Sequence, residues 1–272
     1  MNYKLNIAWL YPDLMSTYGD RGNIVVLQKR CEWRGIEAEI IPITLETANS
    51  ELSRCDLIFM GGAQDRQQKL AGEDFLNRKG PVVKKMVEDN VPALFVCAAY
   101  QFVGNYYLPY QGEKIIGAGI FDLYTEHPGD QGKRLIGNVV AEVISDELIG
   151  SPSTSFDYAQ DKSSGRLSKT IIGFENHGGY TYLGDKMNPL AKIIKGNGNN
   201  GKDGFEGAVY KNSIGSYFHG PLLPKNPMIA DWLITKALEK KYGKKIALNP
   251  LDDTLAHNAR NAIMKRLGIN HD

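Results

Sequence analysis

The stretch Pro92–Phe102 constrains the fold of this 272-residue chain more than any other. A short apolar run ends at Cys97, and two small residues then lead into a segment that can begin a helix. A sharp turn from a strand into a helix exposes the side chain at the turn, at the carboxyl edge of a sheet. Positive potential at the helix N-terminus favours a thiolate there. Cys97 is therefore a candidate nucleophile, but this stretch alone supports a buried, inert cysteine equally well.

The first hundred residues alternate apolar runs with helical segments. Apolar runs predict strands at 5–10, 38–43, 57–60 and 93–96, and helical spacing predicts helices at 24–33 and 81–90. Such alternation predicts an α/β fold with a doubly wound, mostly parallel sheet and helices on both faces. Since sites in these sheets lie beyond the carboxyl ends of the strands, Gly61-Gly62 and Cys97 are expected at one edge.

The second half of the chain has a different character. Short strands separated by turn residues are predicted at 115–124, 134–143, 170–174, 180–183, 205–210 and 214–218, and they predict an antiparallel extension of the sheet. The Ser-rich stretch 151–168 reads as an exposed insertion. Two C-terminal helices are predicted within 228–267, at 228–242 and 254–267. We interpret residues 1–272 as a single domain.

Composition excludes several classes of protein. The net charge of +1 gives no reason to expect nucleic acid or an anionic membrane as partner. No apolar run is long enough to cross a membrane, and the N-terminal residues lack the pattern of a signal peptide. Three cysteines without metal-ligand spacing indicate a reducing cytoplasm and no zinc site or disulfide framework.

A cysteine nucleophile needs a base, and the chain has five histidines. His271 lies next to the C-terminus, His257 lies on the last predicted helix, and His127 precedes a Pro-Gly turn. His177 and His219 remain, and His219 is favoured because it ends an apolar strand and is followed by Gly220-Pro221. An imidazole within hydrogen-bond reach would activate the thiol and later protonate a leaving amine.

Five stretches, spread over almost the whole chain, resemble the class I glutamine amidotransferases. Within that group the chain is similar to the cobyric-acid-synthase-like branch, and in particular to the glutaminase subunits of lipid II isoglutaminyl synthases. The stretches are 11–23 (Tyr11-Pro12-Asp13-Leu14-Met15 and Tyr18 to Asn23), 61–68 (Gly61 to Gln68), 97–102 (Cys97 to Phe102), 173–179 (Gly173 to Gly179) and 219–227 (His219 to Pro227). The resemblance implies a flavodoxin-like, mostly parallel sheet with an antiparallel extension.

The resemblance also implies roles for particular residues. Cys97 falls on the family's nucleophile and His219 on its catalytic histidine. The backbone N–H groups near Gly62 and of Ala98 fall where the family builds its oxyanion hole. Three substrate-binding residues are implied for glutamine: Arg134, Gln101 and Gln64. The guanidinium of Arg134 would pair with the α-carboxylate, although a solvated surface charge is the alternative.

Two departures from the wider family accompany the resemblance. No acid follows His219 at the His-x-Glu spacing of many relatives, which agrees with a Cys–His dyad. This leaves open what orients the imidazole, and a carboxylate from a partner protein is one option. Ala98-Ala99 stands where the family usually has two glycines.

The resemblance finally implies a partner. This chain would form a heterodimer with a Mur-ligase-like subunit, hydrolyse L-glutamine, and pass ammonia to that subunit, which would amidate the D-glutamate α-carboxylate of lipid II. The chain has no phosphate-binding GxxxxGK[ST] motif, so ATP and Mg²⁺ are expected on the partner. Such a chain would be cytoplasmic, and it would lie at the inner face of the membrane through its partner and lipid II. Two alternatives stay open: a cysteine hydrolase acting on another amide, and a catalytically inactive binding module.

Overall fold

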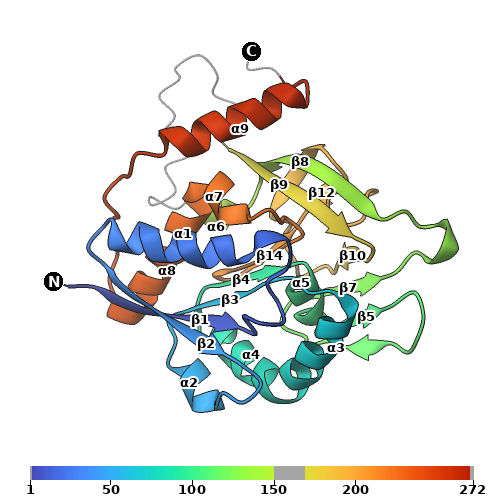
Figure 1. Ribbon diagram of the computed structural model, residues 1–272, viewed down its shortest axis with the longest axis horizontal. Helices are drawn as coiled ribbons and strands as arrows, with labels where there is room; N and C mark the ends of the chain where they lie inside the picture. The colour runs from blue at the N-terminus through green and yellow to red at the C-terminus, as the bar shows by residue number, and fades with distance from the viewer. Residues whose placement is uncertain (1, 150–168, 270–272) are drawn as a thin grey trace.

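The computed structural model describes residues 2–149 and 169–269, so the predicted insertion at 151–168 lies outside the described residues. A six-stranded sheet forms the centre, in the order β13-β14-β4-β3-β1-β2 (Figure 1). Its strands are β1 (Lys4–Leu10), β2 (Glu37–Ile43), β3 (Leu57–Met60), β4 (Ala93–Val96), β13 (Ala208–Tyr210) and β14 (Ser213–Ser216). All pairs are parallel except β13 with β14. The mostly parallel sheet predicted from sequence is confirmed.

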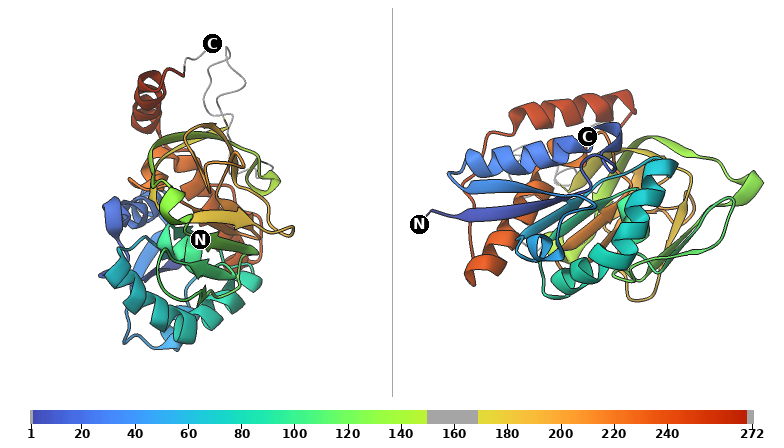
Figure 2. Two further views of the ribbon diagram at one scale, coloured as in Figure 1. Left: turned by 90° about the vertical axis from the view of Figure 1, so that its right-hand side faces the viewer. Right: turned by 60° about the horizontal axis from the view of Figure 1, so that its bottom comes forward.

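Helices cover both faces of this sheet, as the doubly wound prediction requires (Figures 1 and 2). One face packs against α1 (Arg21–Glu32), α7 (Leu222–Lys225) and α8 (Pro227–Tyr242). The other packs against α2 (Asn49–Ser53), α3 (Asp65–Asp74), the π-helical turn η2 (Phe75–Lys79), α4 (Gly80–Glu88) and α5 (Ala98–Phe102).

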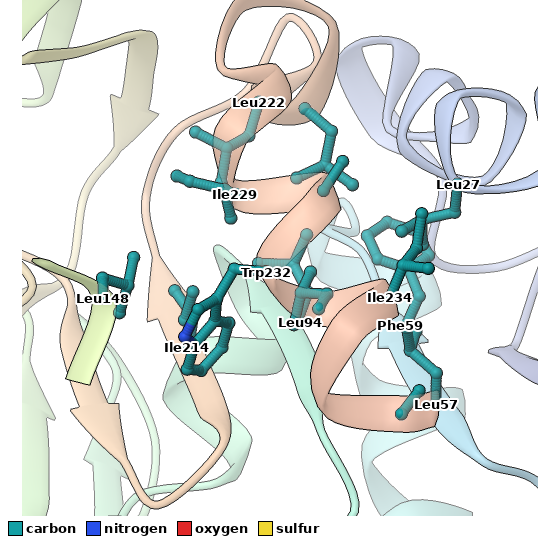
Figure 3. Close-up of a cluster of buried hydrophobic side chains, with 14 of the residues drawn as sticks. Leu27, Leu57, Phe59, Leu94, Leu148, Ile214, Leu222, Ile229, Trp232 and Ile234 are labelled. Atoms are coloured by element: carbon teal, nitrogen blue, oxygen red, sulfur yellow. The ribbon is translucent and has the colours of Figure 1, made fainter. Parts of the chain in front are cut away.

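The central strands are apolar at nearly every position because both of their faces are buried. Alternate side chains enter different cores. Leu57 and Phe59 of β3 join the core under α8, which Figure 3 shows around Trp232, whereas Ile58 and Met60 join the core on the other face. This two-sided burial explains why the sequence showed continuous apolar runs here rather than alternation.

The remaining strands form two separate four-stranded sheets. One has the order β10-β7-β5-β6 and the other β12-β11-β8-β9. Their bounds are β5 (Tyr106–Leu108), β6 (Ile115–Ile116), β7 (Leu123–Glu126), β8 (Leu135–Val143), β9 (Thr170–His177), β10 (Tyr180–Leu183), β11 (Ala191–Lys195) and β12 (Phe205–Glu206). Three short helical elements lie outside these sheets: η1 (Thr17–Gly19), η3 (Gly129–Gln131) and α6 (Asp146–Ile149).

In the main sheet the predicted antiparallel extension is therefore confined to β13, since β14 pairs with β4 in parallel, and the strands of the two smaller sheets do not lengthen the main sheet. The strands of the two smaller sheets pair with one another, and an isolated bridge joins Phe174 of β9 to His219, which follows β14 of the main sheet. This bridge matters for function because it involves the candidate catalytic histidine.

The C-terminal helices agree with the prediction to within a residue at each end. Helix α9 (Thr254–Arg266) lies at the margin of the molecule, beside β8 and β9 (Figures 1 and 2). Met264 packs on Val140 and Ile172, and the buried Arg260 donates to Thr170 O at 2.7 Å and to Asn226 Oδ1 at 2.7 Å. Among the described helices, none is both long and apolar enough to cross a lipid bilayer.

Candidate active site

Four adjacent parallel strands end at one edge of the main sheet, and each is followed by part of the candidate site. His219 comes shortly after β14, Cys97 directly after β4, Gly61-Gly62 directly after β3, and the loop 11–20 after β1. The topology thus brings together residues from four distant parts of the chain. The sequence-based expectation that Gly61-Gly62 and Cys97 share one edge is confirmed.

Cys97 occupies a strained elbow between β4 and α5. Its φ of 55° and ψ of −106° are rare for a residue with a side chain. The Cys97 N–H donates to Ser216 O at 2.8 Å, and its carbonyl accepts from the Gln101 N–H at 3.1 Å, so both neighbouring strand and helix hold the turn. Ala98 and Ala99 are buried in the core beneath it, and the elbow forms with alanines in place of glycines.

A carboxylate that the sequence reasoning missed holds His219. Asp20, fully buried, accepts from His219 Nδ1 at 3.0 Å through Oδ1 and from the Gly62 N–H at 2.7 Å through Oδ2. The acid is not next to His219 in sequence but lies 199 residues away. The signal in the sequence is that Asp20 lies within 18–23, one of the stretches that resemble the family. The site therefore contains Cys, His and Asp, not a Cys–His pair alone.

The electrostatics of the site favour a charged imidazole. Burial by itself lowers the pKa of His219, but the negative sulfur of Cys97 and the hydrogen-bonded Asp20 outweigh burial and raise this pKa to about 10. His219 is thus an imidazolium at neutral pH. Cys97 raises the pKa of His219 mainly through its charge and, to a smaller extent, through a side-chain hydrogen bond.

Tyr18 covers the imidazole from the solvent side. Its ring meets that of His219 edge to face, with centroids 5.2 Å apart and planes at 69°. Tyr18 has a φ of 55° and belongs to the same loop as Asp20. This loop therefore supplies both the carboxylate behind His219 and an aromatic wall in front of it.

Gly62 must be a glycine for steric reasons. A Cβ at this position would lie 2.7 Å from His219 Cε1 and 3.2 Å from Cys97 Cβ, so a side chain would push into the reacting pair. Its N–H already donates to Asp20. The expectation that the Gly62 N–H binds an oxyanion is not supported by this arrangement, because that N–H already donates to Asp20 Oδ2. The next residue, Ala63, lines the cavity, and Ala98 begins α5 at the elbow.

A cavity of about 400 Å³ opens above Cys97 and His219. Its other walls include Tyr18, Ala63, Gln64, Arg66, Arg134 and Asn176. Two predicted substrate-binding residues, Arg134 and Gln64, thus share one cavity with Cys97. Arg66 is a second cation of the lining that sequence reasoning did not select.

Arg134 is held by Asn176 of β9. Its Nε donates to Asn176 Oδ1 at 2.6 Å and its Nη2 to Asn176 O at 3.1 Å. This contact fixes one edge of the guanidinium and leaves Nη1 without a hydrogen-bond partner in the described residues. Arg134 is therefore pre-oriented to bind an anion, which favours the binding role over a solvated surface charge.

Gln101 does not line the cavity. It is buried, its Nε2 donates to Tyr217 Oη at 3.2 Å, and its Oε1 accepts from Gln68 Nε2 at 3.2 Å. As part of α5 it faces the core beneath the elbow. The expectation that Gln101 contacts the substrate is not supported by this placement, because its amide is already paired inside the protein.

His177 has a structural environment. It is buried, its ring stacks on Tyr217 with centroids 3.5 Å apart, and Nδ1 lies 2.7 Å from Gly179 O. Burial lowers the pKa of His177 to about 3, so the ring stays neutral. His177 is absent from the cavity lining, and His219 alone of these two histidines faces Cys97. Within the described ranges, no cluster of three or more His, Cys, Asp or Glu side chains could hold a metal ion.

Comparison with known proteins agrees with this geometry. Residues 6–227 match the CobB/CobQ-like glutamine amidotransferase domain. The chain belongs to this family. This amidotransferase is 38% identical over 239 residues to the lipid II isoglutaminyl synthase (glutamine-hydrolyzing) subunit GatD of Staphylococcus aureus, covering 88% of this chain and 86% of that protein. It is 37% identical over 254 residues to subunit GatD of Streptococcus pneumoniae, covering 93% of this chain and 88% of that protein.

These two relatives confirm the resemblance to glutaminase subunits of lipid II isoglutaminyl synthases that the sequence stretches indicated. Among solved structures, the amidotransferase is similar to PurLQS from Thermotoga maritima, with a TM-score of 0.56 and 16% identity over 90% of this chain and 100% of that one. At such low identity the likeness concerns the fold, and it confirms the amidotransferase-like α/β architecture.

Proposed function

We propose that this chain is the glutamine-hydrolysing subunit of a lipid II isoglutaminyl synthase. The observation that carries the proposal is a nucleophile at a strained elbow, Cys97, that faces an imidazolium, His219, held by a buried carboxylate, Asp20. Arg134 lines the same cavity and offers a cation for the amino-acid end of glutamine. The names of the two similar GatD proteins supply the biological context.

The first half of the reaction forms a thioester. The Cys97 thiolate attacks the side-chain amide carbon of glutamine, and the new C–S bond places negative charge on the amide oxygen. The Ala98 N–H, and the Ala63 N–H in place of that of Gly62, are the proposed donors to this oxyanion. His219 gives its proton to the amide nitrogen, the C–N bond breaks, and ammonia leaves a γ-glutamyl thioester on Cys97.

The second half restores the enzyme. Neutral His219 takes a proton from water as the water oxygen attacks the thioester carbon. The C–S bond then breaks, glutamate leaves, and the thiolate and imidazolium are restored. Asp20 stays ionised throughout, fixes the tautomer of His219 and stabilises its charge. The supporting contact is the 3.0 Å hydrogen bond to Nδ1.

The ammonia would serve a second subunit. We propose a heterodimer with a Mur-ligase-like protein that uses ATP and Mg²⁺ to activate the D-glutamate α-carboxylate of lipid II, which ammonia then converts to D-isoglutamine. This places the chain in the bacterial cytoplasm, at the membrane face where the partner meets lipid II. The support for this step is similarity to the two GatD proteins along most of the chain.

Co-expression with a Mur-ligase-like protein from the same organism tests the proposal. The purified pair should release glutamate from glutamine and amidate lipid II in the presence of ATP. With glutamine as the nitrogen source, Cys97→Ala should abolish both glutamate release and amidation. Added ammonium salt should still support amidation by this variant. Hydrolysis of a different amide without a ligase partner would favour a general cysteine hydrolase. Stable association without glutamate release would favour an inactive binding module.

A further inference from the structure

We propose that His127 and Arg134 together bind the α-carboxylate of the substrate over Gly178. This inference rests on the glutaminase function proposed above and adds a substrate-binding residue to it. His127 belongs to none of the stretches that carry the family resemblance, and as a turn residue it gave no functional signal in the sequence.

The two smaller sheets bring these residues to the same turn. Strand β7 pairs with β10, with Glu126 opposite Tyr180, so His127 comes one residue past the last pair. Strand β8 pairs with β9, with Leu135 opposite His177, so Arg134 comes one residue before the first pair. Gly178 and Gly179 join β9 to β10 and therefore lie between the two side chains.

Atomic distances confirm this juxtaposition. A Cβ at Gly178 would lie 3.6 Å from His127 Nε2 and 3.7 Å from Arg134 Nη1, and no heavy atom outside its chain neighbours would be nearer. A Cβ at Gly178 would thus be in van der Waals contact with both side chains, so the two nitrogens border the same space over Gly178. One carboxylate can accept from two donors up to about 8 Å apart, so both nitrogens can reach the same group.

Both nitrogens are available as donors. His127 Nδ1 accepts the Gly129 N–H at 3.1 Å, which places the proton of a neutral ring on Nε2. The Tyr110 ring, with its centroid 4.9 Å from that of His127, packs against the imidazole and limits its rotation. Arg134 is fixed by Asn176 through Nε and Nη2, so Nη1 is the nitrogen that faces Gly178.

The charge of the surroundings suits an anion. The cavity beside Arg134 is lined by a second cation, Arg66, and no carboxylate is among its described lining residues. Two acids lie near His127 in sequence: Glu126 accepts a hydrogen bond from Tyr106 Oη at 2.8 Å, and Asp130 accepts one from Tyr110 Oη. Free glutamine, which has an α-carboxylate, is therefore favoured as substrate over a glutamine residue within a peptide, whose α-carboxyl group is part of a peptide bond.

The test uses the complex with its ligase partner and compares L-glutamine with L-glutamine α-amide, which lacks the carboxylate. Loss of one hydrogen bond to a charged group corresponds to a change of about tenfold or more. His127→Ala should raise KM for glutamine about tenfold with kcat within about threefold, and should change kcat/KM for the α-amide by less than about twofold. His127→Gln should restore most of the affinity, because its amide nitrogen can occupy the place of Nε2.

Two further measurements separate binding from misfolding. Alkylation of Cys97 by iodoacetamide, which has no carboxylate, should proceed at the wild-type rate in His127→Ala, and His257→Ala on α9 serves as the matched control. Gly178→Val, whose side chain would enter the space between the donors, should also raise KM for glutamine. An unchanged KM in His127→Ala, or an equal loss on both substrates, overturns the proposal. Absence of glutamate release by the wild-type complex would instead refute the proposed function.

Discussion

Asp20→Asn is the substitution that most sharply tests how His219 is held. The carboxylate accepts two hydrogen bonds, from His219 Nδ1 at 3.0 Å and from the Gly62 N–H at 2.7 Å, and it is fully buried. Asparagine keeps the shape but offers one acceptor atom and one NH₂ group. One of the two N–H donors must then face another donor, and the negative charge behind the imidazolium disappears.

The size of the effect follows from these contacts. A hydrogen bond between charged groups contributes about 1.5–3 kcal/mol, and the bond to His219 is the one that changes during the reaction. A loss of about 3 kcal/mol of transition-state stabilisation lowers kcat/KM about 10²-fold, since each 1.4 kcal/mol is a factor of ten. The pKa of His219 should also fall from its raised value, because Asp20 is one of the groups that raises it.

Initial rates of glutamate release by the complex, measured over a range of glutamine concentrations, check this expectation. Asp13→Asn is the matched control, since Asp13 is an exposed aspartate in the same loop and should keep wild-type kinetics. Circular dichroism and the melting temperature report whether the variant folds. A folded Asp20→Asn protein with kcat/KM within threefold of wild type would refute the role assigned to Asp20.

Three other substitutions and conditions have expected outcomes. Because the pKa of His219 is raised to about 10, kcat/KM of the wild type should fall on the alkaline side only near pH 10, as the imidazolium loses its proton; a fall near pH 7 would contradict this. Gly62→Ala should fold but lose at least about tenfold in kcat/KM, because its Cβ would lie 2.7 Å from His219 Cε1; wild-type rates would show that the contact is relieved at no cost. Burial raises the pKa of Glu206 to about 8. The unfolded chain releases this proton near pH 4.3, so the folded state loses about 1.4 kcal/mol per pH unit between the two values. The melting temperature of Glu206→Gln should therefore rise relative to that of the wild type as pH rises from 5 to 8. A difference in melting temperature that does not change with pH would contradict this expectation.

Features that depend on neighbouring residues could be predicted from the sequence. The elbow at Cys97 was predictable because a strand, a small-residue turn and a helix follow one another directly, and the position of His219 because an apolar strand precedes it. The central strands were predictable because burial on both faces leaves continuous apolar runs.

Features that depend on tertiary contacts could not be predicted in the same way. Asp20 reaches His219 only because β1, β3, β4 and β14 lie side by side, and nothing near His219 in sequence reports this. The family resemblance implies a substrate contact for Gln101, but the direction of α5 turns its side chain toward Tyr217. The Gly62 N–H was likewise assigned without knowledge that a buried carboxylate occupies it.

Detection of the acyl-enzyme tests the nucleophile most directly. Intact-protein and peptide mass spectrometry of the rapidly quenched complex with glutamine should find one γ-glutamyl group attached to Cys97. The same adduct should accumulate in a variant that deacylates slowly and should be absent from Cys97→Ala. A glutamyl adduct on another residue, or glutamate release at the wild-type rate by Cys97→Ala, would contradict the assignment of Cys97 as the nucleophile.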